Sequence, residues 1–375
     1  MSRHPLNAVK RQPSTCIWEI TRACNLRCVH CENFGGEKAG NELSFDELLR
    51  AADDLAALGG RHVDITGGEP LLHPNWDRFA AALKERGFRC ALVTNGTLLD
   101  DERLDRAISA GIEITAVSLD GPQKIHDRIR RGPGALFRRG SPFEKTVDAV
   151  RRALPRCTVK VITAVNALNL PYLGETYALL SELGVRDWQI QLTVPVGRAV
   201  ESKTPLVLPP SALNEVTSFI ADAQRDGGEP HIDTSDNIGY YTERERFLRK
   251  RRSGQGVWVG CHAGVRTVAI TYEGKVRGCS ILPPEFDAGD LHAERLRDIW
   301  ADSARFGYST AFDATKLTGD CARCRFGALC RAGCTATAYY STGTVYNNPY
   351  CIYRGGASAG EAASSRACAS VTRNR

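Results

Sequence analysis

The stretch Thr21-Arg-Ala-Cys24-Asn-Leu-Arg-Cys28-Val-His-Cys31 decides how this chain of 375 residues is interpreted. Its cysteines have the spacing C-x3-C-x2-C, so three thiolates can bind one iron-sulfur cubane and leave its remaining iron without a protein ligand. That iron is free to bind a substrate or a cofactor. The alternative is a zinc knuckle, in which His30 or a distant residue supplies the last ligand.

Short β-branched runs alternate with amphipathic helical stretches between about residues 15 and 198. The predicted strands are Cys16–Ile20, His62–Thr66, Arg89–Val93, Ile112–Leu119, Val159–Val165 and Asp187–Thr193. Ser44 and Glu47 form a capping box, and Gly87, Gly111 and Gly184 stand where helices should end. Repeated strand and helix units predict a parallel sheet, closed as a full or partial barrel or open as a doubly wound sheet.

Polar and glycine-rich turns follow the predicted strands at their carboxyl ends. After strands two, three and four they read Gly67-Gly68-Glu69-Pro70, Thr94-Asn95-Gly96 and Ser118-Leu-Asp120-Gly121. In α/β proteins this edge of the sheet is where ligands bind. A plain tight turn is the alternative for each of them, above all for Asn95-Gly96.

A second group of cysteines lies in the C-terminal part of the chain. Cys261 is followed by Gly274 and Cys279, and then comes the run Cys321-x2-Cys324-x5-Cys330-x3-Cys334-x16-Cys351. The alternative to iron-sulfur ligation is a pair of structural zinc sites.

Composition narrows the class of protein. Hydrophobic content of 42% and charged content of 25% are ordinary for a globular protein. The net charge of +6 is spread along the chain, which gives little support for nucleic-acid binding. The N-terminus lacks the apolar core of a signal peptide and no run is long enough for a membrane span, so we expect a cytoplasmic protein. In a reducing compartment, fourteen cysteines indicate metal or cluster ligation.

Taken in order, the cysteine triplet, the Gly67-Gly68-Glu69-Pro70 turn and the Ser118-Leu-Asp120-Gly121 strand end resemble the radical S-adenosylmethionine enzymes. The seven later cysteines resemble the SPASM domain of peptide and sulfatase maturases. The resemblance implies a partial (β/α)6 TIM-like barrel with a C-terminal, cysteine-rich SPASM domain. It also implies that Cys24, Cys28 and Cys31 hold a [4Fe-4S] cluster that binds S-adenosyl-L-methionine. The implied cofactor-binding residues are Gly67, Gly68, Glu69, Asn95 and Ser118.

The resemblance further implies two auxiliary iron-sulfur clusters. Their ligands would be Cys321, Cys324, Cys330 and Cys351 for the distal cluster, and Cys261, Cys279 and Cys334 for the proximal cluster. The proximal set has only three thiolates. Either its cluster has an open iron, or a non-cysteine ligand completes it, or a remote thiol does so (Cys16, Cys90, Cys157 or Cys368), although buried structural thiols are the simpler interpretation of the first three.

Such enzymes use an electron to split S-adenosylmethionine into methionine and a 5'-deoxyadenosyl radical, which abstracts a hydrogen atom from the substrate. The electron donor would be a flavodoxin or a ferredoxin. Ser280 stands where sulfatase maturases have an aspartate, which argues against formylglycine formation and leaves the general base, and any other catalytic residue, unidentified among Asp287, Asp290 and the residues at the barrel rim.

The expected reaction is modification of a ribosomally made peptide by crosslinking or oxidation. Only about fifteen residues precede the first strand, so a separate leader-peptide-binding protein would be needed, or direct capture of the peptide. This favours the alternative, a small-molecule enzyme that decarboxylates or oxidises tetrapyrrole side chains, or dehydrogenates a sugar alcohol. The opening from Cys16 to Cys28 also resembles the tetrapyrrole enzymes. A third possibility is a non-catalytic iron-sulfur sensor or scaffold.

The sequence divides into five predicted segments. They are an N-terminal arm (1–14), the barrel (15–200), a helical bridge (201–256), the SPASM domain (257–353) and a disordered tail (354–375). No nucleic acid and no membrane is expected among the partners.

Overall fold

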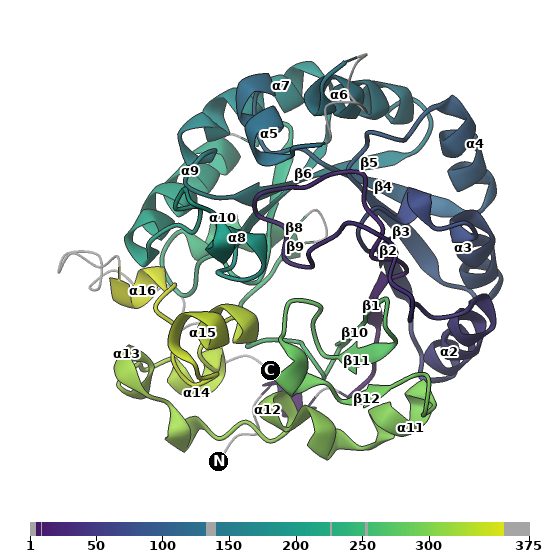
Figure 1. Cartoon of the computed structure of the whole chain (residues 1–375). Helices are drawn as coiled ribbons and strands as arrows, with labels where there is room; N and C mark the ends of the chain where they lie inside the picture. The colour runs from purple at the N-terminus through teal and green to yellow at the C-terminus, as the bar shows by residue number, and fades with distance from the viewer. Residues whose placement is uncertain (1–4, 9, 133–139, 226, 252–253, 356–375) are drawn as a thin grey trace.

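The computed structural model describes residues 5–8, 10–132, 140–225, 227–251 and 254–355. Its main feature is a curved ten-stranded sheet in the order β12-β11-β10-β1-β2-β3-β4-β5-β6-β7. Every neighbouring pair from β10 to β7 in this order is parallel, whereas β11 and β12 add antiparallel pairs at one edge. The predicted parallel sheet is therefore confirmed, and Figure 1 shows it as an open, partial barrel.

The six strands predicted from sequence are present with nearly the predicted limits. They are β1 (Thr15–Glu19), β2 (His62–Thr66), β3 (Arg89–Thr94), β4 (Ile112–Ser118), β5 (Thr158–Val165) and β6 (Asp187–Leu192). Along each strand the buried side chains pack against the helices, as Trp18 of β1 does against Phe79 at a ring distance of 5.0 Å. The alternate side chains, such as Ile17 and Lys160, face the interior of the barrel and line a cavity there.

Helices cover the outer face of the sheet, as Figure 1 shows. Those of the barrel are α2 (Phe45–Ala57), α3 (Trp76–Glu85), α4 (Asp101–Ser109), α5 (Gln123–Ile129), α6 (Pro142–Ala153), α7 (Leu173–Glu182) and α9 (Leu213–Arg225). The capping box of Ser44 and Glu47 is present as predicted, and Ser141 and Glu144 form a second one at the start of α6.

The segment predicted as a helical bridge contributes a strand to the sheet. It follows the short helix α8 (Arg198–Glu201) and holds α9, α10 (Glu245–Leu248) and the short pair β8 (Lys250–Arg251) and β9 (Gly254–Gln255). It also holds β7 (His231–Thr234), which pairs in parallel with β6. This strand was missed because it has only four residues and a polar sequence, so its pairing with β6, rather than its own hydrophobic pattern, defines it.

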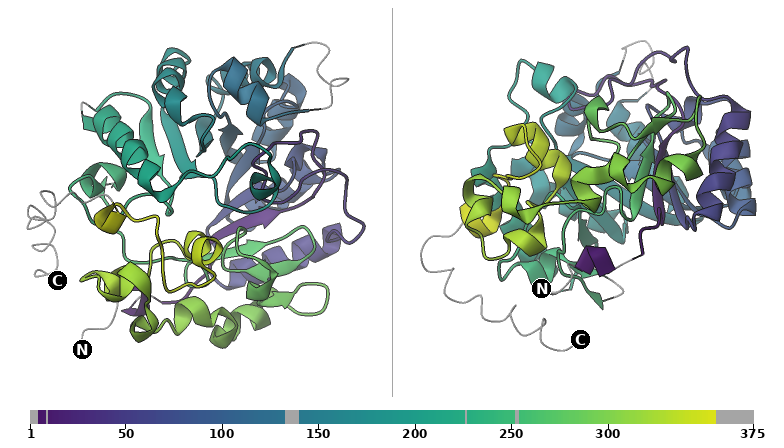
Figure 2. Two further views of the ribbon diagram at one scale, coloured as in Figure 1. Left: turned by 60° about the vertical axis from the view of Figure 1, so that its left-hand side comes forward. Right: turned by 90° about the horizontal axis from the view of Figure 1, so that it is seen from below.

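The C-terminal region continues the barrel sheet at its other edge. Its strands are β10 (Thr267–Ile270), β11 (Lys275–Arg277) and β12 (Gly289–Asp290), and β10 pairs in parallel with β1 from Thr15↔Thr267 to Trp18↔Ile270. Its short helices are α11 (Leu296–Ala301), α12 (Gly307–Thr310), α13 (Gly319–Ala322), α14 (Gly327–Cys330), α15 (Thr335–Thr342) and α16 (Ile352–Gly355). Figure 2 shows this region against the open side of the barrel.

The N-terminal arm contains α1 (Pro5–Ala8), and the predicted tail lies outside the described residues from 356 onward, together with Cys368. In the described part of the chain, no helix combines the length and apolarity that crossing a bilayer requires.

Candidate functional site

A cavity of about 320 Å³ lies at the carboxyl ends of β1 to β6, and we call it the cofactor pocket. Its wall includes the three thiols of the N-terminal motif together with residues from the turns after β2, β3 and β4. The sequence-predicted residues that line it are Cys24, Cys28, Cys31, Gly67, Gly68, Asn95 and Ser118. Motifs that are far apart in the sequence thus meet in one place, and of the predicted cofactor residues only Glu69 is missing from the wall.

The two glycines after β2 let the cysteine loop approach the sheet. A Cβ atom at Gly67 would lie 2.3 Å from the carbonyl oxygen of Thr21, and one at Gly68 would lie 2.3 Å from that of Ala23. The amides of Gly68 and Glu69 donate to these same two oxygens at 2.8 and 2.7 Å. Gly67 also has a φ of +145°, which side chains rarely allow. The glycines therefore dock the loop that carries Cys24 onto β2.

Glu69 is fully buried and supports the neighbouring turn. Its Oε1 accepts hydrogen bonds from Leu71 N at 3.2 Å and Thr94 Oγ1 at 2.8 Å, and its Oε2 accepts one from Asn95 N at 2.8 Å. Burial raises its pKa to about 7, although these hydrogen bonds oppose the shift. Since a carboxylate can accept about four hydrogen bonds, one position on Oε2 remains for a further donor.

Asn95 joins the turn after β3 to the cysteine loop. Its side-chain amide donates to Asn25 Oδ1 at 2.9 Å, and its own Oδ1 accepts from the amide of Thr97 at 2.9 Å. Asn25 in turn donates to Thr97 Oγ1 at 2.8 Å. Asn95 therefore orders the loop between Cys24 and Cys28 besides lining the pocket.

Behind the loop lies a buried ion pair of Asp120 and Arg130. The two side chains meet at 2.6 Å, Asp120 also accepts from the amide of Ala164 at 2.9 Å, and His30 Nε2 lies 3.7 Å away. Burial raises the pKa of Asp120, but the positive charge of Arg130 outweighs it and holds that pKa below its usual range. Burial lowers the pKa of His30 to about 4, so this imidazole is neutral. In the sequence, Asp120 was interpreted only as a possible turn residue.

Arg198, after β6, closes the loop from the opposite side. Its guanidinium donates to the carbonyl oxygen of Gly35 at 2.6 Å, and its amide donates to that of Cys31 at 2.9 Å. Gly197 lies so close that a Cβ there would be 2.4 Å from the same Cys31 oxygen. The loop is thus fixed before any ligand binds.

The thiols of the pocket have the chemistry of cluster ligands. Burial raises the pKa of Cys24 to about 12 and that of Cys28 to about 11. Without a cation both are neutral, and iron would supply the positive charge that deprotonates them. Within the described residues, no three His, Cys, Asp or Glu side chains converge as ligands of a single ion. Thiols spread over a pocket wall suit a cluster, in which each thiolate binds a different iron.

Two carboxyl groups of the pocket were not identified from the sequence. Glu19 is 4% exposed at the end of β1, and Glu32 directly follows Cys31; burial raises the pKa of each to about 7. A charged residue at the carboxyl end of a strand is the signal that could have revealed Glu19. Conversely, Asp287 and Asp290 are engaged with β11, since Asp287 pairs with Arg277 and Asp290 with Lys275.

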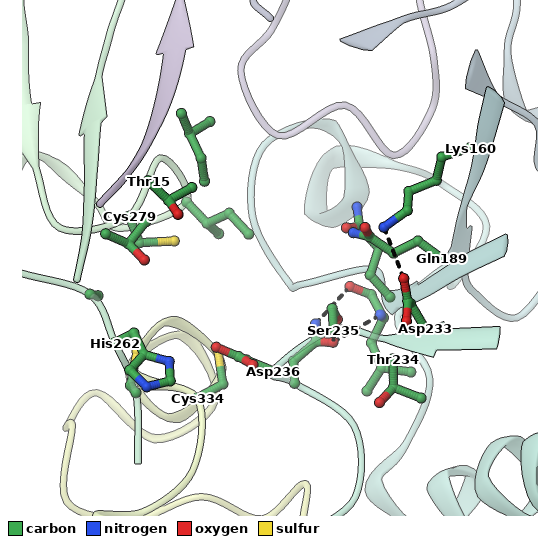
Figure 3. A pocket seen from close by; sticks show the side chains of 18 of the residues that line it. Thr15, Lys160, Gln189, Asp233, Thr234, Ser235, Asp236, His262, Cys279 and Cys334 are labelled. Carbon is green, nitrogen blue, oxygen red and sulfur yellow. Dashed lines mark hydrogen bonds and ion pairs between the residues drawn. The ribbon is translucent and has the colours of Figure 1, made fainter. Parts of the chain in front are cut away.

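A second cavity of about 820 Å³, the inner cavity, lies inside the barrel. Its wall contains all three thiols of the proximal set, Cys261, Cys279 and Cys334. Figure 3 shows Cys279 and Cys334 on one side of the cavity, and Lys160, Gln189 and Asp233 on the other. The two cavities share wall residues, namely Ile17, Gln191, Cys279 and Ile281. Cys279 therefore faces both.

The distal set forms a third, smaller pocket lined by Cys321, Cys324, Cys330 and Cys351. Between Cys330 and Cys334 the backbone has three consecutive positive φ angles, 54° at Arg331, 59° at Ala332 and 70° at Gly333. This left-handed turn directs Cys330 into the distal pocket and Cys334 into the inner cavity. Neither the distal pocket nor the inner cavity is lined by the remote thiols Cys16, Cys90 and Cys157.

Comparison with known proteins gives a consistent assignment. Residues 18–180 match the family model of the radical SAM superfamily, and residues 261–325 match that of the SPASM iron-sulfur cluster-binding domain. An AdoMet-dependent heme synthase of Methanosarcina barkeri is 30% identical over 93% of this chain and 99% of its own length.

A more distant relative is named for biosynthesis of a bacteriocin. The subtilosin biosynthesis protein AlbA of Bacillus subtilis is 25% identical over 83% of this chain and 67% of its own length. Among solved structures, Streptococcus suis SuiB bound to its precursor peptide SuiA superimposes with a TM-score of 0.70, at 14% identity, over 92% of this chain and 76% of that one. That likeness concerns the fold alone.

Proposed function

Because this chain belongs to the radical SAM superfamily and carries a C-terminal SPASM domain, we propose that it is a radical SAM oxidoreductase that acts on the carboxylate side chains of a tetrapyrrole. Enzymes of this family use S-adenosylmethionine and a [4Fe-4S] cluster, and SPASM domains bind auxiliary iron-sulfur clusters. When bound, these groups supply a 5'-deoxyadenosyl radical and a route for electrons. The electron donor in this proposal is a flavodoxin or a ferredoxin.

The residues around the cofactor pocket have proposed roles that follow from their contacts. Cys24, Cys28 and Cys31 hold the catalytic cluster. The remaining acceptor position of Glu69 suits the ammonium group of S-adenosylmethionine, and the Ser118 hydroxyl suits its ribose. The loop that carries the cysteines is held by Asn95 and Arg198, so the pocket is preorganised.

The observation that carries the substrate proposal is similarity to a heme synthase along nearly the whole of both chains. The inner cavity supports it, because 820 Å³ lies within the range of sites for large organic ligands. Its wall also carries the cationic or potentially cationic side chains that carboxylates require, Arg89, Lys160, His231 and His262.

Lys160 is the most direct candidate for such a contact. Its ammonium group lies 3.0 Å from Asp233 on the same side of the inner cavity, and both side chains are partly exposed, at 27% and 34%. A substrate carboxylate can therefore approach the same ammonium group from the cavity. Replacing Lys160 with Gln is expected to weaken binding of a tetrapyrrole carboxylate about tenfold, the effect of losing one charge-assisted hydrogen bond.

The test is anaerobic incubation of the enzyme with S-adenosylmethionine, dithionite and either carboxylated porphyrins or short peptides. We expect deoxyadenosine to form with a porphyrin, accompanied by loss of carbon dioxide from that porphyrin in mass spectra. Porphyrin turnover that is unaffected by Lys160→Gln would contradict the role of Lys160. Lys84→Gln, at an exposed pair with Glu113, serves as the control.

Peptide modification, the activity first expected from the sequence, is the second candidate, and the similarity to AlbA supports it. In that case a peptide would occupy the joined cavities and a separate leader-binding protein would present it. Deoxyadenosine formed with peptides and not with any porphyrin would favour this activity over the first.

A further inference from the structure

The proximal set offers only three thiolates to its cluster, yet its surroundings include a carboxylate. Asp236 follows β7 and lines the inner cavity with Cys261, Cys279 and Cys334. In Figure 3 its side chain points toward Cys334 and His262 and away from Lys160 and Gln189.

A hydrogen-bond bridge fixes the backbone of Asp236 next to Cys334. The hydroxyl of Tyr240 donates to the carbonyl oxygen of Asp236 at 2.5 Å and accepts from the amide of Cys334 at 2.9 Å. Tyr240 is itself buried, 1% exposed, and its ring packs on Trp258 at 5.1 Å. The hydroxyl oxygen of Tyr240 thus bridges the backbones of Asp236 and Cys334. It connects the loop after β7 to the turn before α15.

Neighbouring residues hold the loop rigidly and leave the Asp236 carboxylate available. The Asn237 side chain forms hydrogen bonds to both the amide and the carbonyl of Leu192, at 3.2 and 3.0 Å, and the amide of Ser235 donates to Ile190 at 2.9 Å. By contrast, no described residue forms a hydrogen bond or an ion pair with the carboxylate of Asp236, which is exposed to the cavity.

We propose that Asp236 is the fourth ligand of the proximal auxiliary cluster, which is then held by three thiolates and one carboxylate and has no open iron. Carboxylate oxygens are competent iron ligands at neutral pH, and they need no deprotonation there. It follows that substrate binds beside this cluster in the inner cavity and not on its iron.

Among the described residues, Tyr308 and His262 are further candidate ligands of the proximal cluster. Tyr308 lies near Cys261 and Cys279. His262 directly follows Cys261 and points into the cavity in Figure 3. Tyr308→Phe and His262→Ala therefore belong in the same experiment.

The test is spectroscopic and does not depend on turnover. In a full-length parent carrying Cys24→Ala, Cys28→Ala and Cys31→Ala, only the auxiliary clusters remain, with about eight irons per chain. We expect the EPR spectrum of the reduced parent to be unchanged by an added small thiol such as 2-mercaptoethanol. After Asp236→Ala, one of the two cluster signals should shift on addition of the thiol, because an iron has become accessible. After Asp236→Cys, that signal should be shifted from the start and be insensitive to the thiol.

Controls separate ligation from folding. Asp222→Ala removes an exposed carboxylate that pairs with Arg225 on α9, and it should behave as the parent. If Asp236→Ala does not fold, Asp236→Asn provides the same comparison with less change in shape. A thiol-induced shift already present in the parent would overturn the proposal. The proposal would also be overturned if the added thiol shifted the EPR signal of Tyr308→Phe or His262→Ala but not that of the Asp236 variants.

Discussion

Glu69 illustrates how a single residue can serve both the fold and the cofactor. It is completely buried, and three donors from residues 71, 94 and 95 already occupy its oxygens. The turn after β3 is therefore built around this carboxylate, and through Asn95 the carboxylate also orders the cysteine loop. The position still open on Oε2 is the one that we assign to the cofactor.

Glu69→Gln tests this double role. A glutamine amide would place a donor against the Asn95 or Leu71 amide, so we expect a loss of stability of about 1–3 kcal/mol. We also expect the Kd for S-adenosylmethionine to rise at least tenfold while the iron content stays intact. Equilibrium binding and iron analysis measure these effects. The control variant Thr94→Val removes one hydrogen-bond donor and keeps the Glu69 carboxylate, so its affinity for S-adenosylmethionine should change less. Unchanged binding of S-adenosylmethionine by Glu69→Gln would refute the assignment.

Some residues of the site could be identified from the sequence, and others could not. The first cysteine triplet was identified by its spacing, and the two later cysteine sets, the glycines and Ser118 by resemblance to a family; the structure brings each cysteine set to the wall of one pocket. Which atoms the glycines approach was not predictable, because that depends on how the loop around Ala23 folds back onto β2. Glu19, Arg130 and Asp236 were missed, since each acts through neighbours that are distant in sequence.

At the scale of elements, α2 joins the barrel to the C-terminal region. Asp54, 2% exposed on α2, accepts two hydrogen bonds from Arg295 at 2.9 and 2.7 Å. Arg295 immediately precedes α11, so this ion pair fixes that helix against the barrel. The adjacent Asp53 also forms an ion pair, with Arg86, but its side chain is 60% exposed.

These neighbouring aspartates give a matched pair of variants. Asp54→Ala leaves Arg295 without its partner in a mostly buried contact, and we expect Tm to fall by roughly 5 °C. Asp53→Ala removes a solvent-exposed pair, so its Tm should change by no more than about 2 °C. Differential scanning calorimetry of the holoenzymes measures both. Equal effects would show that α11 is held by its apolar contacts alone.

A second contact between the same regions depends on pH. His292 Nδ1 lies 2.9 Å from Glu47 of α2, and this hydrogen bond raises the pKa of His292. Hydrogen bonds, first from Ser44 and then from His292, lower the pKa of Glu47 to about 2. The contribution of Glu47 to folding stability is complete above its pKa in the unfolded chain, near 4.5, and falls as the pH drops toward 2. The contribution of His292 to folding stability is complete below its pKa in the unfolded chain, near 6.5. It is lost as the pH rises through the higher pKa that His292 has in the folded protein.

His292→Gln should therefore cost stability chiefly between about pH 4.5 and 6.5. The loss should be below about 1 kcal/mol, because both groups are partly exposed and solvent screens them. Denaturant titrations of variant and wild type at several pH values measure this difference. A difference that is constant up to pH 9 would exclude the ion pair as its cause.

For the whole molecule, the sequence predicted the parallel sheet and the partial barrel, but it did not show that strands of the C-terminal region join the same sheet. Hydrophobic patterning identified the first six strands because each is long enough to show its period. It could not show that β7 and β10 extend the same sheet, because that pairing joins residues far apart in sequence. The five predicted segments therefore remain a description of the sequence, whereas one sheet runs through three of them.

The distal set provides a prediction at this scale. Cys321→Ala removes one of four thiols in an enclosed pocket, so we expect a loss of about four irons per chain and of most product formation. Cys157→Ser is the matched control, because Cys157 lies beside β5 and contacts Thr115 at 3.4 Å. Iron analysis and product yield measure the outcome. Full iron content and turnover in Cys321→Ala would show that the distal assignment is wrong.

The pairing of β1 with β10 has a consequence for biosynthesis. About 250 residues separate the two strands, so β1 lacks one neighbour until most of the chain has left the ribosome. At typical translation speeds of about 5–20 residues per second, that interval lasts on the order of ten seconds or more. During this time the unpaired edge of β1 can attract other strands. Nascent chains truncated before residue 267 should accordingly aggregate.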